Sequence, residues 1–261
     1  MLGMVTDNWA YREQVQFLKE VSGNLPWVNA GHYTRPTFYD GLAGYGYQAS
    51  FFGYQFDYLK SLYGWKGSQL VTLFERVPLD YYPTVRWRGL AEQAIFGNMR
   101  GVGRLGGDTW SVVKDKAGKR LARAWERFPN ASWGYLNCNS ATLAPGPDGA
   151  VATVRYEALR EGLQECEARV AIEAALTDPA LKAKVGDELA KRYQDVMVER
   201  QRAFWRSLAA MQSGPLPSHD DGHAWRSAVI SGHLWFVGSD WQGRSEKLYS
   251  LAGEVARKAK N

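Results

Sequence analysis

The chain has 261 residues, of which 45% are hydrophobic and 23% are charged, a composition typical of a globular protein. The formal net charge is +5, but basic and acidic residues alternate along the predicted helices, so we expect no nucleic-acid partner. The one basic cluster, residues 257–260, is interpreted as a solvated helix end. No apolar run reaches the roughly 18 residues that a membrane span needs, so no membrane partner is expected.

The first half of the chain alternates short apolar runs with helical patterns, which is typical of parallel β-α units. The predicted strands are Leu2–Thr6, Trp27–Tyr33, Tyr47–Phe52, Leu70–Phe74 and Gly101–Leu105, and the predicted helices are Tyr11–Val21, Phe56–Leu62 and Val85–Met99. These make about five units, whereas a complete eight-unit barrel takes about 250 residues. We therefore predict the α/β class, with a partial or complete (β/α) TIM-type barrel.

The pattern changes after Gly149 and becomes helical. Apolar spacing predicts a helix over residues 153–176, whose buried seam is Tyr156, Leu159, Leu163, Cys166 and Val170. Asp178 before Pro179 favours a second helix, expected to run to about Ala210. A last helix is predicted over Ser245–Lys258. We therefore expect two domains, a barrel portion over residues 1–150 and a helical C-terminal region over residues 151–261 packed on the barrel.

Polar and aromatic residues follow each predicted strand. In α/β barrels the reacting groups lie at the carboxyl ends of the strands, so these positions are candidates for a substrate pocket. They are Asp7, Asn8, His32, Tyr33, Tyr54, Glu75, Asp108 and Trp110. Five barrel strands alone leave two open sheet edges, which predicts a missing N-terminal domain, a partner or a homo-oligomer.

A Pro/Gly turn and the charged helix after it carry the most distinctive motif of the chain. Residues 145–149 read PGPDG, and Arg155, Glu157, Leu159, Arg160, Gly162 and Glu167 follow at fixed spacing. This string resembles the segment that closes the catalytic barrel in glycoside hydrolase family 123, the β-N-acetylgalactosaminidase-like group. Glu165 stands where that family usually has Asp. The resemblance implies a glycosidase-like chain that acts on or binds an N-acetylhexosamine-containing glycan, with no metal or organic cofactor.

The resemblance also implies a substrate-assisted mechanism. In such enzymes the 2-acetamido group of the sugar attacks the anomeric carbon, an Asp orients that amide, and the adjacent Glu protonates the leaving oxygen. Asp7 matches the orienting Asp, but the next position holds Asn8. An amide has no proton to give near neutral pH. The chain is then either a glycosidase with another acid, or a non-catalytic carbohydrate-binding or scaffolding protein that kept the fold.

Glu75 is the candidate replacement acid. Together with Asp108 it would place two carboxylates across a barrel mouth, which suits ordinary glycoside hydrolysis. The alternatives are structural: Glu75 pairs with Arg76 or Arg104, and Asp108 caps a helix while Trp110 packs in the core.

Three further patterns receive structural interpretations. The glycines of residues 101–106 spell a dinucleotide fingerprint but read as a strand themselves, so we expect close backbone packing there. His219 and His223 lie in a linker and are interpreted as a surface turn, not a metal site. The charged residues of the helix after the PGPDG turn, Glu165 included, are expected to form ion pairs along the helix flank.

Overall fold

The computed structural model describes residues 2–3, 11–25, 27–31, 43–49, 71–74, 84–96, 101–103, 115–119, 141–212 and 234–260. Contacts divide the chain into two compact units. The first comprises residues 1–50, 69–90 and 99–160, and the second comprises residues 51–68, 91–98 and 161–261. The described elements combine a parallel sheet with helices, which is consistent with the α/β class, and the described residues show no closed barrel.

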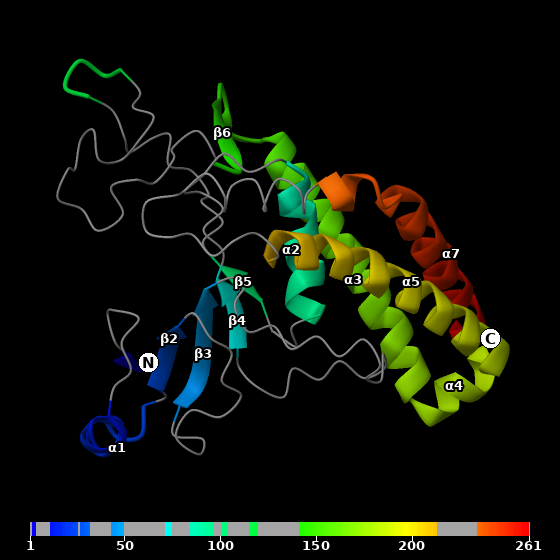
Figure 1. Ribbon diagram of the computed structural model, residues 1–261, viewed down its shortest axis with the longest axis horizontal. Coiled ribbons are helices and arrows are strands. Elements are labelled where there is room, and N and C mark those ends of the chain that lie inside the picture. Colours follow the sequence, from blue (N-terminus) through cyan, green and yellow to red (C-terminus); the bar gives the residue numbers. More distant parts are fainter. Residues whose placement is uncertain are drawn as a thin grey trace. The chain divides into compact units, whose positions relative to one another are not determined.

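The first unit contains a five-stranded parallel sheet in the order β1-β2-β3-β4-β5 (Figure 1). The strands are β1 Leu2–Gly3, β2 Trp27–Gly31, β3 Ala43–Ala49, β4 Val71–Phe74 and β5 Val102–Gly103. Each strand pairs in parallel with the next one in sequence, and the register shifts once, between Trp27 and Val28. All five strands fall at predicted positions, although β3 begins four residues earlier than Tyr47.

Two helices are described in the β-α part of the chain, and the predicted helix Phe56–Leu62 lies outside the described residues. Helix α1, Arg12–Val21, ends at the predicted residue, and Gly23 and Asn24, which follow it, both have positive φ angles. Helix α2, Val85–Phe96, connects β4 to β5 in sequence, and its apolar residues Leu90, Ala94 and Ile95 are all buried. In the first unit Trp87 and Leu90 pack with Leu159, and Val102 of β5 lies against this cluster.

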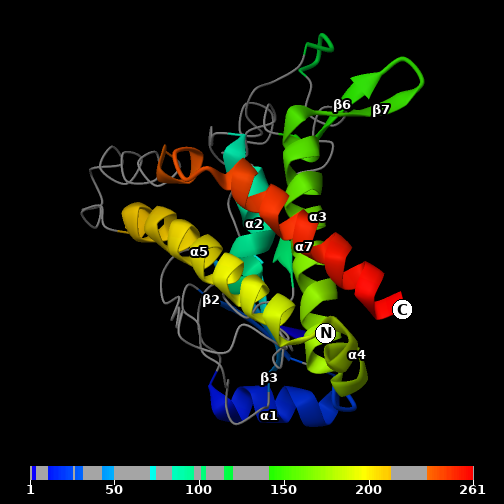
Figure 2. The same ribbon diagram turned by 90° about the vertical axis from the view of Figure 1, so that its right-hand side faces the viewer.

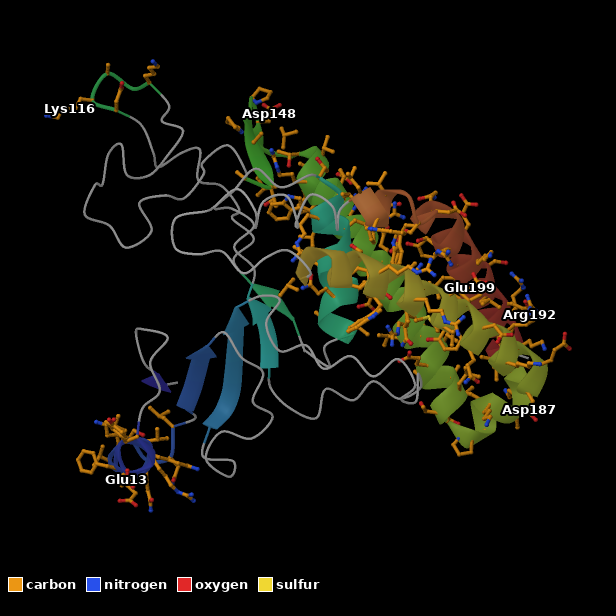
Figure 3. The ribbon with its side chains drawn as sticks, in the orientation of Figure 1. Glu13, Lys116, Asp148, Asp187, Arg192 and Glu199 are labelled. Carbon is orange, nitrogen blue, oxygen red and sulfur yellow. The ribbon has the colours of Figure 1, made fainter. Side chains whose placement is uncertain are left out.

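The PGPDG segment forms a β-hairpin. Strands β6 Leu143–Gly146 and β7 Gly149–Ala152 pair antiparallel across a two-residue turn, with Asp148 at the tip (Figure 3). The turn depends on glycine, because a Cβ atom at Gly146 would lie 2.8 Å from the carbonyl oxygen of Gly149. The Thr153 hydroxyl donates to the Thr142 carbonyl at 2.8 Å and accepts from the Tyr156 backbone N–H at 3.4 Å. One side chain therefore closes the hairpin and caps the helix that follows.

In the described part of the C-terminal half, four helices have defined bounds: α3 Val154–Thr177, α4 Pro179–Val185, α5 Asp187–Gln212 and α7 Trp241–Lys260. The start at Asp178 is confirmed, because its Oδ1 accepts from the backbone N–H groups of Ala180 and Leu181. The single helix predicted over residues 179–210 is wrong. Gly186, with φ of 86°, ends α4 and separates it from α5.

The second unit has its own apolar core, in which α7 packs along α5 and α4 (Figures 1 and 2). Val185, Leu189 and Met197 are buried there, as are Leu248, Leu251 and Val255 of α7, and Leu181 is partly buried against them. The predicted seam of α3 is partly wrong: Leu159 and Cys166 are buried, but Tyr156 and Leu163 are 39% and 47% exposed. Polar side chains take their place on the buried face of α3.

The basic tail is more than a solvated helix end. Lys258 Nζ donates to the carbonyl oxygen of Val185, the last residue of α4, at 3.0 Å. Lys184 of α4 donates in return to the carbonyl oxygen of Ala259 in α7, at 3.4 Å. Each lysine thus satisfies a carbonyl at the C-terminal end of the other helix, where a positive charge is also favoured by the helix dipole.

Candidate functional site

All eight residues predicted to line a substrate pocket lie outside the described residues. They are Asp7, Asn8, His32, Tyr33, Tyr54, Glu75, Asp108 and Trp110. The strands that precede them are described, however. His32 is next in sequence to Gly31, where β2 ends, and Glu75 is next to Phe74, where β4 ends. Their roles stay predictions.

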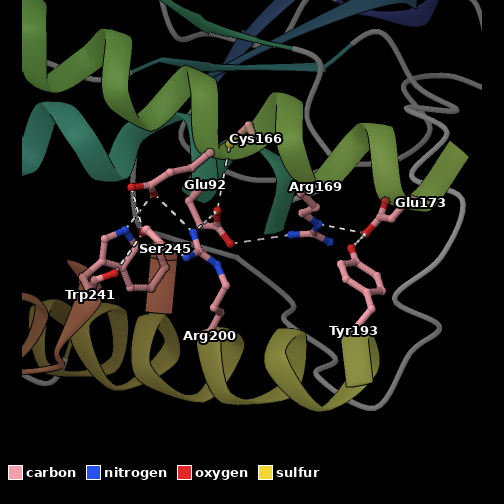
Figure 4. Close-up of polar contacts among 9 residues, drawn as sticks. Glu92, Cys166, Arg169, Glu173, Tyr193, Arg200, Trp241 and Ser245 are labelled. Atoms are coloured by element: carbon pink, nitrogen blue, oxygen red, sulfur yellow. Dashed lines mark hydrogen bonds and ion pairs between the residues drawn. The ribbon is translucent and has the colours of Figure 1, made fainter. Parts of the chain in front are cut away.

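The best-defined polar site is a buried cluster within the second unit (Figure 4). We call it the buried polar cluster. It consists of Glu92 from α2; Glu165, Arg169 and Glu173 from α3; Tyr193 and Arg200 from α5; and Trp241 and Ser245 from α7. Charged groups are rarely buried to this extent unless they are paired. The contacts below pair each of them.

Arg200 lies at the centre of one half of the cluster. Its Nη2 is 3.2 Å from Glu92 Oε2 and 3.2 Å from Glu165 Oε2. Its Nη1 donates to the Ser245 hydroxyl at 3.2 Å. The guanidinium carbon lies 4.1 Å from the centroid of the Trp241 ring, a cation–π contact. Four helices therefore meet at one fully buried cation.

Glu165 accepts hydrogen bonds from two side chains of α7. Trp241 Nε1 donates to its Oε2 at 2.8 Å, and the Ser245 hydroxyl donates to its Oε1 at 2.8 Å. The expectation that Glu165 pairs along the flank of its own helix is therefore wrong. Arg160 and Glu157 do form such an exposed pair one turn apart.

The other half of the cluster is built on Glu173. Its Oε1 accepts from Arg169 Nε at 2.9 Å and from the Tyr193 hydroxyl at 2.8 Å. Burial opposes the charge on Arg169, but Glu92 and Glu173 outweigh it, so its pKa is raised. Burial also raises the pKa of Tyr193, and the Glu173 carboxylate adds to this effect although Arg169 opposes it. Tyr193 thus remains a hydrogen-bond donor throughout the neutral range.

Cys166 borders the cluster, with its thiol 3.9 Å from Glu92 Oε2. Burial, and then the negative charge of Glu92, raise the pKa of this thiol well above its ordinary value. A thiol held in its neutral form is a poor nucleophile and a poor metal ligand. Within the described part of the chain, no group of three or more His, Cys, Asp or Glu residues is placed to hold a metal ion.

The cluster is too buried for direct chemistry on a substrate. Arg200 is 0% exposed, and Glu92 and Glu165 are 1% exposed each. Its carboxylates are bound by guanidinium, hydroxyl and indole groups of the protein itself. We conclude that the cluster joins helices and offers no exposed surface for a ligand.

Hydrophobic periodicity did not reveal this cluster, but a signal for it exists. In α5 the buried positions Leu189, Tyr193, Met197, Arg200 and Phe204 follow helical spacing, so a charged residue occupies a core position. In α7 Ser245 stands likewise between Trp241 and Leu248. A charged or polar residue on an apolar stripe predicts a buried partner, although the sequence does not say which one.

A surface groove of about 440 Å³ runs between α5 and α7. Charges of both signs line it, among them Arg192, Asp195, Glu246 and Lys247. Arg192 is paired with Glu254, and Lys247 with Glu199; Arg192 and Glu199 are labelled in Figure 3. This pattern is typical of a solvated helix-helix surface and indicates no particular ligand.

Comparison of the chain with protein-family models, with curated proteins and with solved structures finds no match. Among the described helices, none combines the length and the apolar character that crossing a membrane requires.

Proposed function

We propose that this chain is a glycoside hydrolase-like protein with a (β/α) TIM-type barrel portion, acting on or binding a glycan that contains N-acetylhexosamine. The observation that carries the proposal is the strand order. In β1-β2-β3-β4-β5 every neighbour is the next strand in sequence, and all pairs are parallel. Doubly wound sheets reverse their order at a switch point, whereas barrels do not.

This order has a direct consequence for the candidate residues. The carboxyl ends of parallel neighbouring strands open on one edge of the sheet, which is where α/β proteins bind their ligands. Asp7 follows β1, His32 follows β2, Glu75 follows β4 and Asp108 follows β5 in sequence. The proposal is that these side chains converge there on a sugar.

The resemblance at residues 145–167 supports the carbohydrate assignment. Its PGPDG turn forms the hairpin tip, and its charged part forms the first turns of α3. Leu159, one of the matching residues, packs with Trp87 and Leu90 of α2 in the first unit. The motif residues thus belong to a helix that builds the core beside β5.

The proposed chemistry needs one orienting carboxylate and one acid. Asp7 would accept a hydrogen bond from the 2-acetamido N–H while the acetamido oxygen attacks the anomeric carbon and the glycosidic C–O bond breaks. The leaving oxygen must receive a proton, and Asn8 has none to give. Glu75 would donate it, and water would then open the cyclic intermediate and return a proton to Glu75.

The test is hydrolysis of an aryl N-acetyl-β-galactosaminide by the parent chain and by Asn8→Glu, Glu75→Gln and Glu13→Gln variants. Glu13 is an exposed residue of α1 (Figure 3) and serves as the matched Glu→Gln control. We expect parent activity that falls by about 10²- to 10⁴-fold in Glu75→Gln, the usual contribution of a general acid. Activity of the control should be unchanged.

The second candidate, a carbohydrate-binding protein without activity, is favoured by Asn8. It predicts no turnover by the parent, a calorimetric binding signal with N-acetylhexosamine oligosaccharides, and turnover gained in Asn8→Glu. Absence of both turnover and binding in the parent and in Asn8→Glu would contradict the carbohydrate assignment itself.

A further inference from the structure

The contacts of the buried polar cluster connect α2 to α7 through one side chain. Glu92 of α2 and Glu165 of α3 both lie 3.2 Å from the same Arg200 nitrogen, Nη2. The other terminal nitrogen of Arg200 donates to Ser245 of α7, and the guanidinium stacks against Trp241 of α7 (Figure 4). A displacement of α7 therefore removes contacts from the same guanidinium that holds Glu92.

Burial makes these contacts interdependent. Arg200 is 0% exposed, so solvent does not replace a protein partner that is lost. Electrostatic interactions are strong in such an environment, and a change at one contact alters the strength of the others. An exposed pair such as Arg192 and Glu254 lacks this property, because water and salt screen it.

We propose that Arg200 couples the packing of α2 to the docking of α7, so that loosening either helix loosens the other. Because α2 connects β4 to β5 in sequence, the C-terminal helix thereby influences a helix of the β-α part of the chain. This inference is independent of any sugar chemistry. It assigns α7 a conformational role beyond that of covering apolar surface.

The experiment is hydrogen–deuterium exchange, read by mass spectrometry, on the full chain carrying Ser245→Ala. This change removes the hydroxyl that bridges Arg200 and Glu165 and leaves α2 untouched. The matched control is Ser250→Ala, the same substitution at an exposed position of the same helix. We expect Ser245→Ala to raise exchange in the peptide covering residues 91–96 about fivefold or more. Ser250→Ala should leave it unchanged.

Coupling is reciprocal, so the reverse measurement must agree. Glu92→Gln should raise exchange at residues 241–245 more than at residues 251–258, where Leu251 and Val255 hold α7 by apolar contacts. The surface variant Glu188→Gln, at an exposed position of α5, should have no effect at residues 241–245. Unchanged exchange in α2 on Ser245→Ala overturns the proposal. An equal rise over every helix also overturns it, because that pattern reports global destabilisation alone.

Discussion

Arg200 illustrates how much one side chain determines in the second unit. It is fully buried and contacts two carboxylates, one hydroxyl and one indole ring. Burying a charge is costly, and the attraction of its partners offsets that cost only while every partner is present. Removal of Arg200 would leave Glu92 and Glu165 as buried carboxylates without this cation.

Arg200→Met should therefore lower the free energy of unfolding by about 3–5 kcal/mol, the range for breaking a buried pair on one side. Arg192→Met on the same helix removes a surface pair with Glu254 and should cost about 0–1 kcal/mol. Urea unfolding of both variants beside the parent measures the two losses. Equal losses of unfolding free energy in the two variants would contradict the conclusion that Arg200 is an important contact between the helices.

The raised pKa of Tyr193 predicts that the free energy of unfolding changes with pH in the alkaline range. Its pKa is raised in the folded chain by burial and by Glu173, so the folded state keeps the phenolic proton that the unfolded chain releases above about pH 10. The contribution of Tyr193 to the free energy of unfolding is therefore complete below that pH and declines above it. Tyr193→Phe loses the hydrogen bond to Glu173, but it also has no hydroxyl to titrate, so its free energy of unfolding does not fall with pH for this reason.

The stability gap between parent and Tyr193→Phe should therefore narrow between pH 8 and pH 11. Urea midpoints across this range measure it, with Tyr156→Phe, at a partly exposed position, as the control. A gap that stays constant or widens with pH would rule out this assignment.

The thiol of Cys166 should react very slowly with alkylating reagents in the native chain. Its thiol is buried and its pKa is raised, so little thiolate is present at pH 8. We expect iodoacetamide to label it at least about 100-fold more slowly in the native chain than in guanidinium, as read by peptide mass mapping. Fast labelling of the Cys166 peptide in native conditions would show that α2 and α3 separate readily.

At the scale of single elements, periodicity and capping signals located most helices to within a few residues. Helices α1, α2 and α3 begin within one residue of the predicted positions, and Asp178 caps α4 as expected. The break at Gly186 was missed, because both flanking segments continue the apolar spacing. The hairpin β6–β7 was predicted only as a turn, since Leu143–Gly146 and Gly149–Ala152 carry no strand alternation.

Gly186→Ala should destabilise the second unit. The residue has φ of 86°, and a Cβ atom there meets no atom within 4 Å, so the cost is backbone strain alone. We expect a loss of about 1–2 kcal/mol. Gly253→Ala, inside α7, should instead stabilise the chain by about 0.5–1 kcal/mol, because its Cβ fits at ordinary contact distance. Thermal or urea unfolding would reveal the opposite signs.

At the scale of the whole molecule, the sequence predicted an α/β protein, with which the described elements are consistent, but not the contacts between those elements. Alternating apolar runs located five parallel strands, because burial on both faces requires such runs. They could not reveal that Glu92 and Arg200, 108 positions apart, contact one another. Periodicity describes one element at a time, whereas a buried ion pair is a property of two. The candidate glycan residues lie beyond the described ranges, so Asp7, Glu75 and Asp108 remain predictions.

The paired contacts of Lys184 and Lys258 make the last turn of α7 a support for α4, a helix much earlier in the sequence. Removing α7 from Lys258 onward would take away the donor that the carbonyl of Val185 accepts from. Shortening α7 should therefore fray the C-terminal end of α4. A cleavage just before Lys258 would thereby weaken hydrogen bonding more than 70 positions earlier in the sequence, at Val185.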